Sequence, residues 1–205
     1  MRFDGTYVSW GTRSVIFKTE KGECYKVYRR KVRPHLPRKE FDLLMIAYRN
    51  GLRVPEPIEL LDVELSDSLV GQIKDKEYRK EFGEGKSFAA LRRKFIDGRV
   101  MGKRWLPSKQ VWDSYKEVNE KLFALGYTAY DFIPHNYIVD SQGEVYLIDL
   151  DRALPISSEE IPSERKAMEK VPNTHFGRAV FDVKAWILRN TWWRVLDAVG
   201  FDEES

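Results

Sequence analysis

The stretch Asp131-Phe132-Ile133-Pro134-His135-Asn136, followed by Leu147-Ile148-Asp149-Leu150-Asp151, decides which fold we expect for this chain. Asp131 and Asn136 lie five residues apart in a segment typical of a loop. Two strand-like runs, residues 137–140 and 145–148, flank a turn that contains glycine, a pattern that predicts a β-hairpin. Asp149 follows the second run, which turns back towards the loop, so we expect Asp131, Asn136 and Asp149 to converge.

These three side chains suit phosphoryl transfer. Transfer from ATP to a hydroxyl needs a carboxylate at the acceptor and oxygen ligands that hold Mg²⁺ against the phosphates. Taken alone, Asp131 and Asn136 are also typical turn residues that bond to their own backbone. The hypothesis therefore depends on Asp149 and on residues further upstream.

The upstream region predicts a small sheet and one helix. Residues 6–30 alternate apolar and polar side chains around glycines, which indicates three short antiparallel strands. Apolar residues then recur at helical spacing over residues 37–50, before Gly51. Residues 58–63 and 68–73 are weaker strand candidates.

Gly83-Glu84-Gly85 separates this region from one with helix-like periodicity, so we place a boundary there, giving units 1–84 and 85–205. The clearest helix follows Ser108, a plausible N-cap, and ends before Gly126. A last helix is predicted over residues 181–196, and its tryptophans favour a place in the core.

The order of these features resembles the protein-kinase-like superfamily, whose catalytic loop has Asp and Asn five residues apart, followed by a strand that ends in a metal-binding Asp. The resemblance spans residues 5–153 and implies a role for six residues. These are Asp131 as catalytic base, Asn136 and Asp149 as metal ligands, Lys26 at the α- and β-phosphates, Glu40 as its ion-pair partner, and Gly11 in the phosphate loop.

The chain departs from the superfamily's usual pattern in three places. Ala129 and Tyr130 stand where histidine and arginine usually precede the catalytic Asp, and Gly11 alone remains of the Gly-rich loop. The loop at 131–136 looks more like that of aminoglycoside and sugar phosphotransferases, and Asp149-Leu150-Asp151 is similar to lipopolysaccharide sugar kinases. The reduced Gly loop instead resembles RIO-type atypical protein kinases. No Ala-Pro-Glu follows Asp151, so we do not expect an ordinary eukaryotic-type protein kinase.

We therefore expect an α+β, two-lobe protein-kinase-like fold, with a small antiparallel sheet and one helix in the N-lobe and a compact, mainly helical C-lobe. The expected function is ATP- and Mg²⁺-dependent phosphorylation of a hydroxyl, on a sugar or other small molecule or on Ser/Thr. A nucleotide-binding pseudokinase or assembly factor is an alternative, because Ala129 and Tyr130 replace the usual residues. An RNA-associated scaffold that uses the basic clusters is a second alternative.

Composition limits the other classes. The 205 residues carry 35 Lys and Arg against 32 Asp and Glu, a net charge of +3 that is too even to indicate nucleic-acid binding by itself. Cys24 is the single cysteine, so one chain forms neither a disulfide framework nor a cysteine zinc cluster. No window approaches the roughly 18 apolar residues of a membrane span, and no apolar signal core follows Met1, so we expect a cytoplasmic protein without membrane contact.

Several residues carry two interpretations at this stage. Lys26 begins a basic run and also fits a solvent-facing strand position, and Glu40 also fits an ordinary acid in the first turn of a helix. Asp151 is either a third metal ligand or a surface turn acid, and His135 suits a substrate contact or a capping group. The basic clusters over 29–39 and 92–104 are typical of solvated faces, unless they converge on an acidic partner or RNA.

Overall fold

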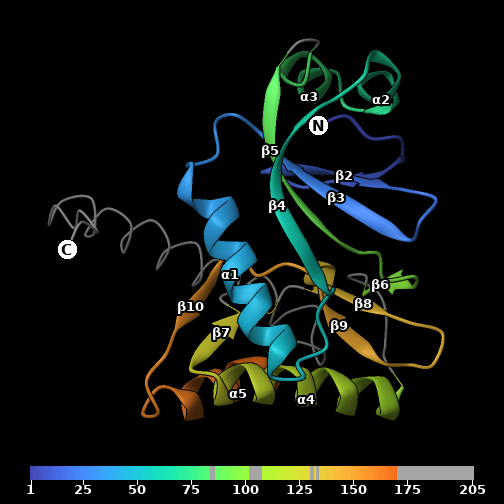
Figure 1. Cartoon of the computed structure of the whole chain (residues 1–205). Coiled ribbons are helices and arrows are strands. Elements are labelled where there is room, and N and C mark those ends of the chain that lie inside the picture. Colours follow the sequence, from blue (N-terminus) through green and yellow to red (C-terminus); the bar gives the residue numbers. More distant parts are fainter. Residues whose placement is uncertain (84–85, 102–107, 130–131, 133, 170–205) are drawn as a thin grey trace, which may run out of the picture.

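The computed structural model describes residues 1–83, 86–101, 108–129, 132 and 134–169. These residues form a mixed α+β fold that combines a five-stranded antiparallel sheet, two smaller sheets and several helices (Figure 1). The predicted α+β class with a small antiparallel sheet is confirmed. No helix in the described ranges has the length and apolar character to cross a membrane.

Strands β1 (Thr6–Trp10), β2 (Ser14–Lys18) and β3 (Glu23–Tyr28) form the meander that the alternation predicted. Val15 and Val27 are paired across β2 and β3 and are fully buried. Gly22, in the turn between these strands, has φ +71°, a conformation that glycine adopts without steric cost. The prediction of three strands is confirmed.

Helix α1 (His35–Arg49) confirms the helix predicted over 37–50, with its start two residues earlier. Leu43, Leu44 and Ala47 are buried on the side of α1 that packs on the sheet. The amide of Leu52 donates to the carbonyl of Ala47, and Gly51 has φ +70°, as expected where a helix stops. This packing carries Glu40 to the inner side of the helix.

Strand β4 (Pro57–Glu64) confirms the candidate at 58–63, but the strand predicted over 68–73 is wrong. The chain there forms helix α2 (Asp67–Gln72), and helix α3 (Lys76–Glu81) follows, so the expectation of one helix beside the sheet is wrong: residues 1–83 form three. Ser66 caps α2 by accepting from the amide of Leu69, and Asp75 caps α3. Capping and the burial of Leu69 and Val70 decide the conformation of a segment whose apolar residues are also compatible with a strand.

The expectation of helical periodicity directly after Gly85 is also wrong. Strand β5 (Ser87–Lys94) lies between β3 and β4 in the sheet order β1-β2-β3-β5-β4. A central strand covered on both faces loses simple alternation, which explains the misleading pattern. The sheet therefore continues past the predicted boundary between residues 84 and 85.

The remaining described elements surround a small hairpin. Helix α4 (Lys109–Ala124) confirms the helix after Ser108, whose side chain accepts from the amide of Val111. Strands β8 (Tyr137–Val139) and β9 (Val145–Leu147) confirm the predicted hairpin and form a sheet with β6 (Arg99–Val100). The predicted helix at 181–196 lies outside the described residues.

Strand β7 (Tyr127–Ala129) pairs with β10 (Ala153–Pro155), and α5 (Ile161–Glu169) lies beside α4 (Figure 1). The short 3₁₀-helix η1 (Pro134–Asn136) immediately precedes β8. Gly98 approaches β8 closely, since a Cβ there would clash with the carbonyl oxygen of Val139. This close packing requires glycine before β6.

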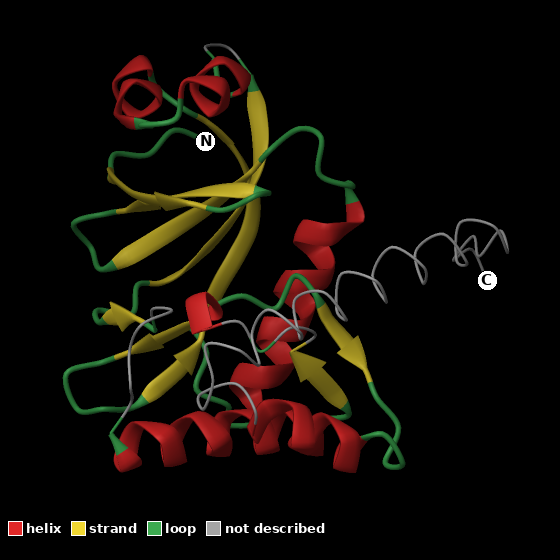
Figure 2. Cartoon of the chain, turned by 180° about the vertical axis from the view of Figure 1, so that it is seen from behind, coloured by secondary structure: helices red, strands yellow, loops and turns green. Residues whose placement is uncertain are grey.

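Two buried clusters organise the molecule. One joins the five-stranded sheet to α2 and α3 through side chains such as Phe17, Ile73 and Phe88. The other joins α1 and α4 to the hairpin through side chains such as Leu44 and Leu122. Viewed from behind, the five-stranded sheet and α4 lie at opposite ends, with the hairpin between them (Figure 2). The five-stranded sheet meets the rest of the fold where Lys26 of β3 contacts Glu40 in α1 and Asp149 after β9.

Candidate functional site

Lys26 and Glu40 form a buried ion pair between β3 and α1. The Nζ of Lys26 lies 2.8 Å from both carboxylate oxygens of Glu40, and the side chains are 3% and 0% exposed. The hydroxyl of Tyr28 donates to the same carboxylate at 2.7 Å. The interpretations of Lys26 as a solvent-facing residue and of Glu40 as an ordinary first-turn acid are therefore wrong. Such burial is costly unless each charge is compensated, as it is here.

Asp149 joins this pair from the end of β9. Its Oδ1 lies 3.0 Å from the Nζ of Lys26 and accepts from the backbone amide of Asp151 at 3.2 Å. The side chain of Asp149 is 34% exposed, unlike those of Lys26 and Glu40. Lys26 thus connects a buried carboxylate on one side to a partly exposed carboxylate on the other.

Burial and the neighbouring charges shift the pKa values of Lys26, Glu40 and Asp149. Burial by itself lowers the pKa of Lys26, but the carboxylates of Asp149 and Glu40 raise it above the usual value. Burial raises the pKa of Glu40, while the charge of Lys26 opposes the rise. For Asp149, the effect of burial is outweighed by Lys26 and the Asp151 amide, so its pKa lies below the usual value. Lys26 and Asp149 are therefore both charged at neutral pH.

Asn136 lies next to the strand end that carries Asp149. Its carbonyl accepts from the amide of Ile148 at 2.8 Å, and the residue that follows it, Tyr137, pairs with Leu147 in the hairpin. The sequence predicted this proximity from the return of the hairpin towards the loop. Asp131 lies outside the described residues, so its predicted place beside Asn136 stays a prediction.

The donor set fits Mg²⁺ only if phosphates and water complete the coordination. Within the described ranges, both hydrogen bonds to Asp149 use Oδ1, which leaves Oδ2 as a candidate ligand. No group of three His, Cys, Asp or Glu side chains among these residues is arranged to hold a metal. Mg²⁺ usually takes one or two carboxylates and fills its other positions with water and substrate phosphates. Asp149 with the amide oxygen of Asn136 matches that pattern.

The turn between β1 and β2 reaches the same cluster. Gly11 lies in this turn, where its amide donates to the carbonyl of Ser14 at 2.9 Å. Two residues later, the Nη1 of Arg13 lies 2.7 Å from the Oδ2 of Asp151. The surface interpretation of Asp151 is therefore incomplete, because its side chain is only 11% exposed and pairs across the fold.

Arg93 is a residue of the site that sequence reasoning missed. It lies on β5, is 5% exposed and donates from Nη1 to the carbonyl of Ile148 at 2.6 Å. This contact fastens β5 to the residue before Asp149. The interpretation of the basic cluster as a solvated face is therefore wrong for Arg93. The basic residues around it in the sequence did not indicate that it is buried. Its neighbours Arg92 and Lys94 form ion pairs with Glu23.

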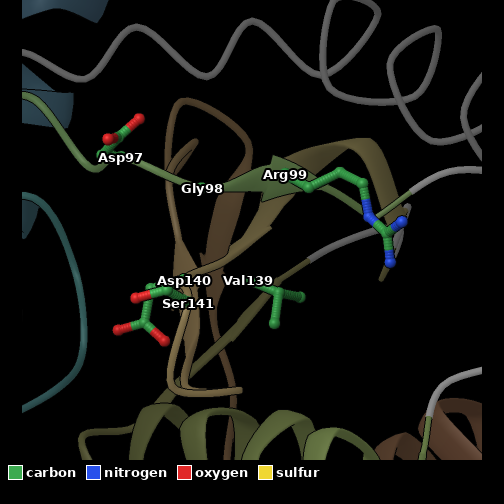
Figure 3. Close-up of a pocket in the computed structure, with 6 residues that line it drawn as sticks. All are labelled: Asp97, Gly98, Arg99, Val139, Asp140 and Ser141. Atoms are coloured by element: carbon green, nitrogen blue, oxygen red, sulfur yellow. The ribbon is translucent and has the colours of Figure 1, made fainter.

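The structure thus brings together Lys26, Glu40 and Asp149, places Asn136 beside them, and connects the Gly11 turn to them through Arg13. A separate pocket of about 460 Å³ lies over β6 and the end of β8 (Figure 3). Its lining shares no residue with the predicted site and comprises Asp97, Gly98, Arg99, Val139, Asp140 and Ser141. His135, in η1, is exposed.

Comparisons with known proteins add no family assignment. No family model matches the chain, and no curated protein sequence matches it significantly. We therefore infer the function from the geometry of the site and from its motifs.

Tyr28→Phe is expected to lower the free energy of unfolding by about 1–3 kcal/mol, because it removes one hydrogen-bond donor from the buried Glu40 carboxylate, which then depends on Lys26. Urea unfolding of the variant and the wild type measures this difference. Tyr48→Phe, at an exposed position on α1, is the matched control and should leave stability unchanged. A Tyr28→Phe protein as stable as the wild type would show that the hydroxyl does not stabilise Glu40.

Proposed function

We propose that the chain is an ATP- and Mg²⁺-dependent phosphotransferase that acts on a hydroxyl acceptor, with a two-lobe protein-kinase-like fold. The observation that carries the proposal is the buried Lys26, held by Glu40 at 2.8 Å and by Asp149 at 3.0 Å. Residues 26, 40 and 149 come from three separated segments, and the motif order singled them out as one set. An unrelated strand lysine would not be expected to meet both predicted partners.

Two features support the two-lobe arrangement. One hydrophobic cluster joins the five-stranded sheet to α2 and α3, and a second joins α4 and the hairpin to α1 and to Tyr28 and Leu91 of the sheet. Lys26 belongs to the first region and Asp149 to the second, so their contact lies where the two regions meet. Nucleotide sites commonly form at such junctions.

In the proposed site, Lys26 binds the α- and β-phosphates and Glu40 orients its ammonium group. Asp149 and Asn136 would hold Mg²⁺, which neutralises phosphate charge when bound. Asp131 would orient the acceptor hydroxyl and accept its proton as a general base. Positioning and electrostatic stabilisation supply most of the catalysis in this class of reaction.

The acceptor is proposed to be a small polar molecule such as a sugar, with a Ser/Thr side chain as the other possibility. Both fit a chain in which no Ala-Pro-Glu motif follows Asp151. An RNA scaffold gains no support from Arg92 and Lys94, whose charges are compensated by Glu23, with Glu59 as a further partner of Arg92. The pseudokinase alternative predicts nucleotide binding without turnover. A cytoplasmic location stays a prediction.

Mg²⁺ with ATP is expected to raise the melting temperature, because a ligand that binds only the native state stabilises it by mass action. Asp149→Ala should abolish most of this shift by removing the metal ligand. Asp42→Ala, in an exposed ion pair on α1, is the control and should keep the full shift. Thermal unfolding with MgATP, ATP plus chelator, or no ligand measures the effect. An undiminished shift in Asp149→Ala would contradict the assignment of Asp149.

A further inference from the structure

Arg13 is the most accessible of three cations around the proposed site. The side chains of Lys26 and Arg93 are 3% and 5% exposed, whereas that of Arg13 is 31% exposed. Lys26 is already bound by two carboxylates, and Arg93 is buried against the carbonyl of Ile148. A newly arriving anion therefore meets Arg13 more readily than either of the other cations.

Among the residues that the structure describes, the charges of the cluster balance one another. Three cations, Lys26, Arg13 and Arg93, face three carboxylates, Glu40, Asp149 and Asp151. A triphosphate adds several negative charges, which one Mg²⁺ ion neutralises only in part. A cation that exchanges a carboxylate partner for phosphate would improve the balance.

The guanidinium of Arg13 has suitable chemistry and a suitable place. Its contact with Asp151 uses Nη1, and a guanidinium carries five N–H donors in a planar fork that matches phosphate oxygens. Asp151 in turn donates its backbone amide to Asp149. Asp151 therefore connects Arg13 to Asp149, the predicted metal ligand.

The turn that carries Arg13 is held in position by helix α3. The hydroxyl of Tyr78 donates to the carbonyl of Gly11 at 2.7 Å. The guanidinium of Arg29 lies 4.0 Å from the Tyr78 ring centroid, donates to the carbonyl of Thr12 at 3.3 Å and pairs with Glu81 at 2.6 Å. The backbone amide of Arg29 also donates to the carbonyl of Arg13. These contacts pre-organise the turn, which lowers the entropy lost on binding.

We propose that Arg13 is a phosphate-binding residue of the nucleotide site, held by Asp151 beside Asp149 until a nucleotide phosphate replaces that carboxylate. This inference rests on the proposed function, because it assumes a nucleotide at Lys26 and Asp149. It adds a side-chain ligand from the turn where the Gly-rich loop is reduced to Gly11.

The test compares the affinities of the full chain for MgATP and for adenosine by calorimetric titration. Arg13→Ala should weaken MgATP binding about tenfold or more, as expected for removal of a charged hydrogen bond, while adenosine affinity changes by less than about twofold. Arg13→Lys should fall between Arg13→Ala and the wild type, because lysine keeps the charge but not the fork. Arg38→Ala, which removes an arginine from an exposed ion pair on α1, is the matched control.

Two results would overturn the inference while leaving the proposed function in place. These are an unchanged MgATP affinity in Arg13→Ala, and equal losses of MgATP and adenosine affinity, which would indicate a structural role. A wild-type protein that binds neither compound would overturn the proposed function and this inference together. Melting temperatures without ligand show that each variant is folded before titration.

Discussion

Lys26→Met is expected to lower the free energy of unfolding by about 3–5 kcal/mol at pH 7, the usual cost of removing one partner of a buried ion pair. The substitution leaves the carboxylate of Glu40, which is 0% exposed, with the Tyr28 hydroxyl but without its cation. Urea unfolding followed by circular dichroism measures the loss. The variant should also lack the stabilisation by MgATP that we predict for the wild type.

The loss should depend on pH because it comes from an uncompensated acid. Burial raises the pKa of Glu40 and Lys26 lowers it, so removing Lys26 raises it further. An acid with a raised folded-state pKa costs no stability below its unfolded pKa of about 4.3 and costs more as the pH rises through the folded pKa. The deficit of Lys26→Met should therefore be small near pH 4 and large at pH 7.

The double variant Lys26→Met/Glu40→Gln provides the control, because it removes both charges and keeps the size of each side chain. It should recover part of the stability at pH 7 and lose the pH dependence of the deficit. A single variant as stable as the wild type would contradict the account of the pair. A deficit that is independent of both pH and Glu40 would indicate a packing effect of Lys26 instead.

Asp131→Asn is expected to lower the rate of phosphoryl transfer by roughly 10²–10⁴ while MgATP affinity is retained. Asparagine keeps the size of the side chain but cannot accept the proton of the acceptor hydroxyl, and loss of a positioned base has effects of this size. The measurement is ADP release over a set of sugars, small alcohols and folded protein substrates, with MgATP titrations alongside.

Asp113→Asn, at a half-exposed position on α4, is the control for a general effect of removing an aspartate charge. It should match the wild type in both rate and affinity. Equal losses of binding and rate in Asp131→Asn would indicate a structural Asp131. Wild-type binding of MgATP without ADP release from any acceptor would favour the pseudokinase alternative.

Local patterns predicted helices α1 and α4, which each bury one face, and the strands before Tyr28. The strands before Tyr28, helix α1 and helix α4 all have clear periodicities and recognisable ends, and the structure confirms them. Strand β5 was missed because its neighbours β3 and β4 cover both edges and its residues are buried on both faces. The segment of helix α2 was predicted as a strand because its side chains are compatible with one. The capping of the helix by Ser66 stabilises the helical conformation instead.

The same limit applies to the candidate site. Lys26, Glu40 and Asp149 could be predicted together because their order along the chain matches a known arrangement, and the structure places all three in contact. Arg13 and Arg93 could not be found this way, since their partners, Asp151 and the carbonyl of Ile148, are distant in sequence. No periodicity or motif encodes a single long-range ion pair.

A crystal structure with a non-hydrolysable ATP analogue and Mg²⁺ tests most directly whether Lys26 and Asp149 form a nucleotide site. We predict phosphate oxygens within hydrogen-bond distance of the Nζ of Lys26, and Mg²⁺ coordinated by Asp149 and Asn136. An analogue bound elsewhere, for example in the pocket over β6 and β8, with the Lys26–Asp149 contact unchanged, would contradict a nucleotide site at these residues.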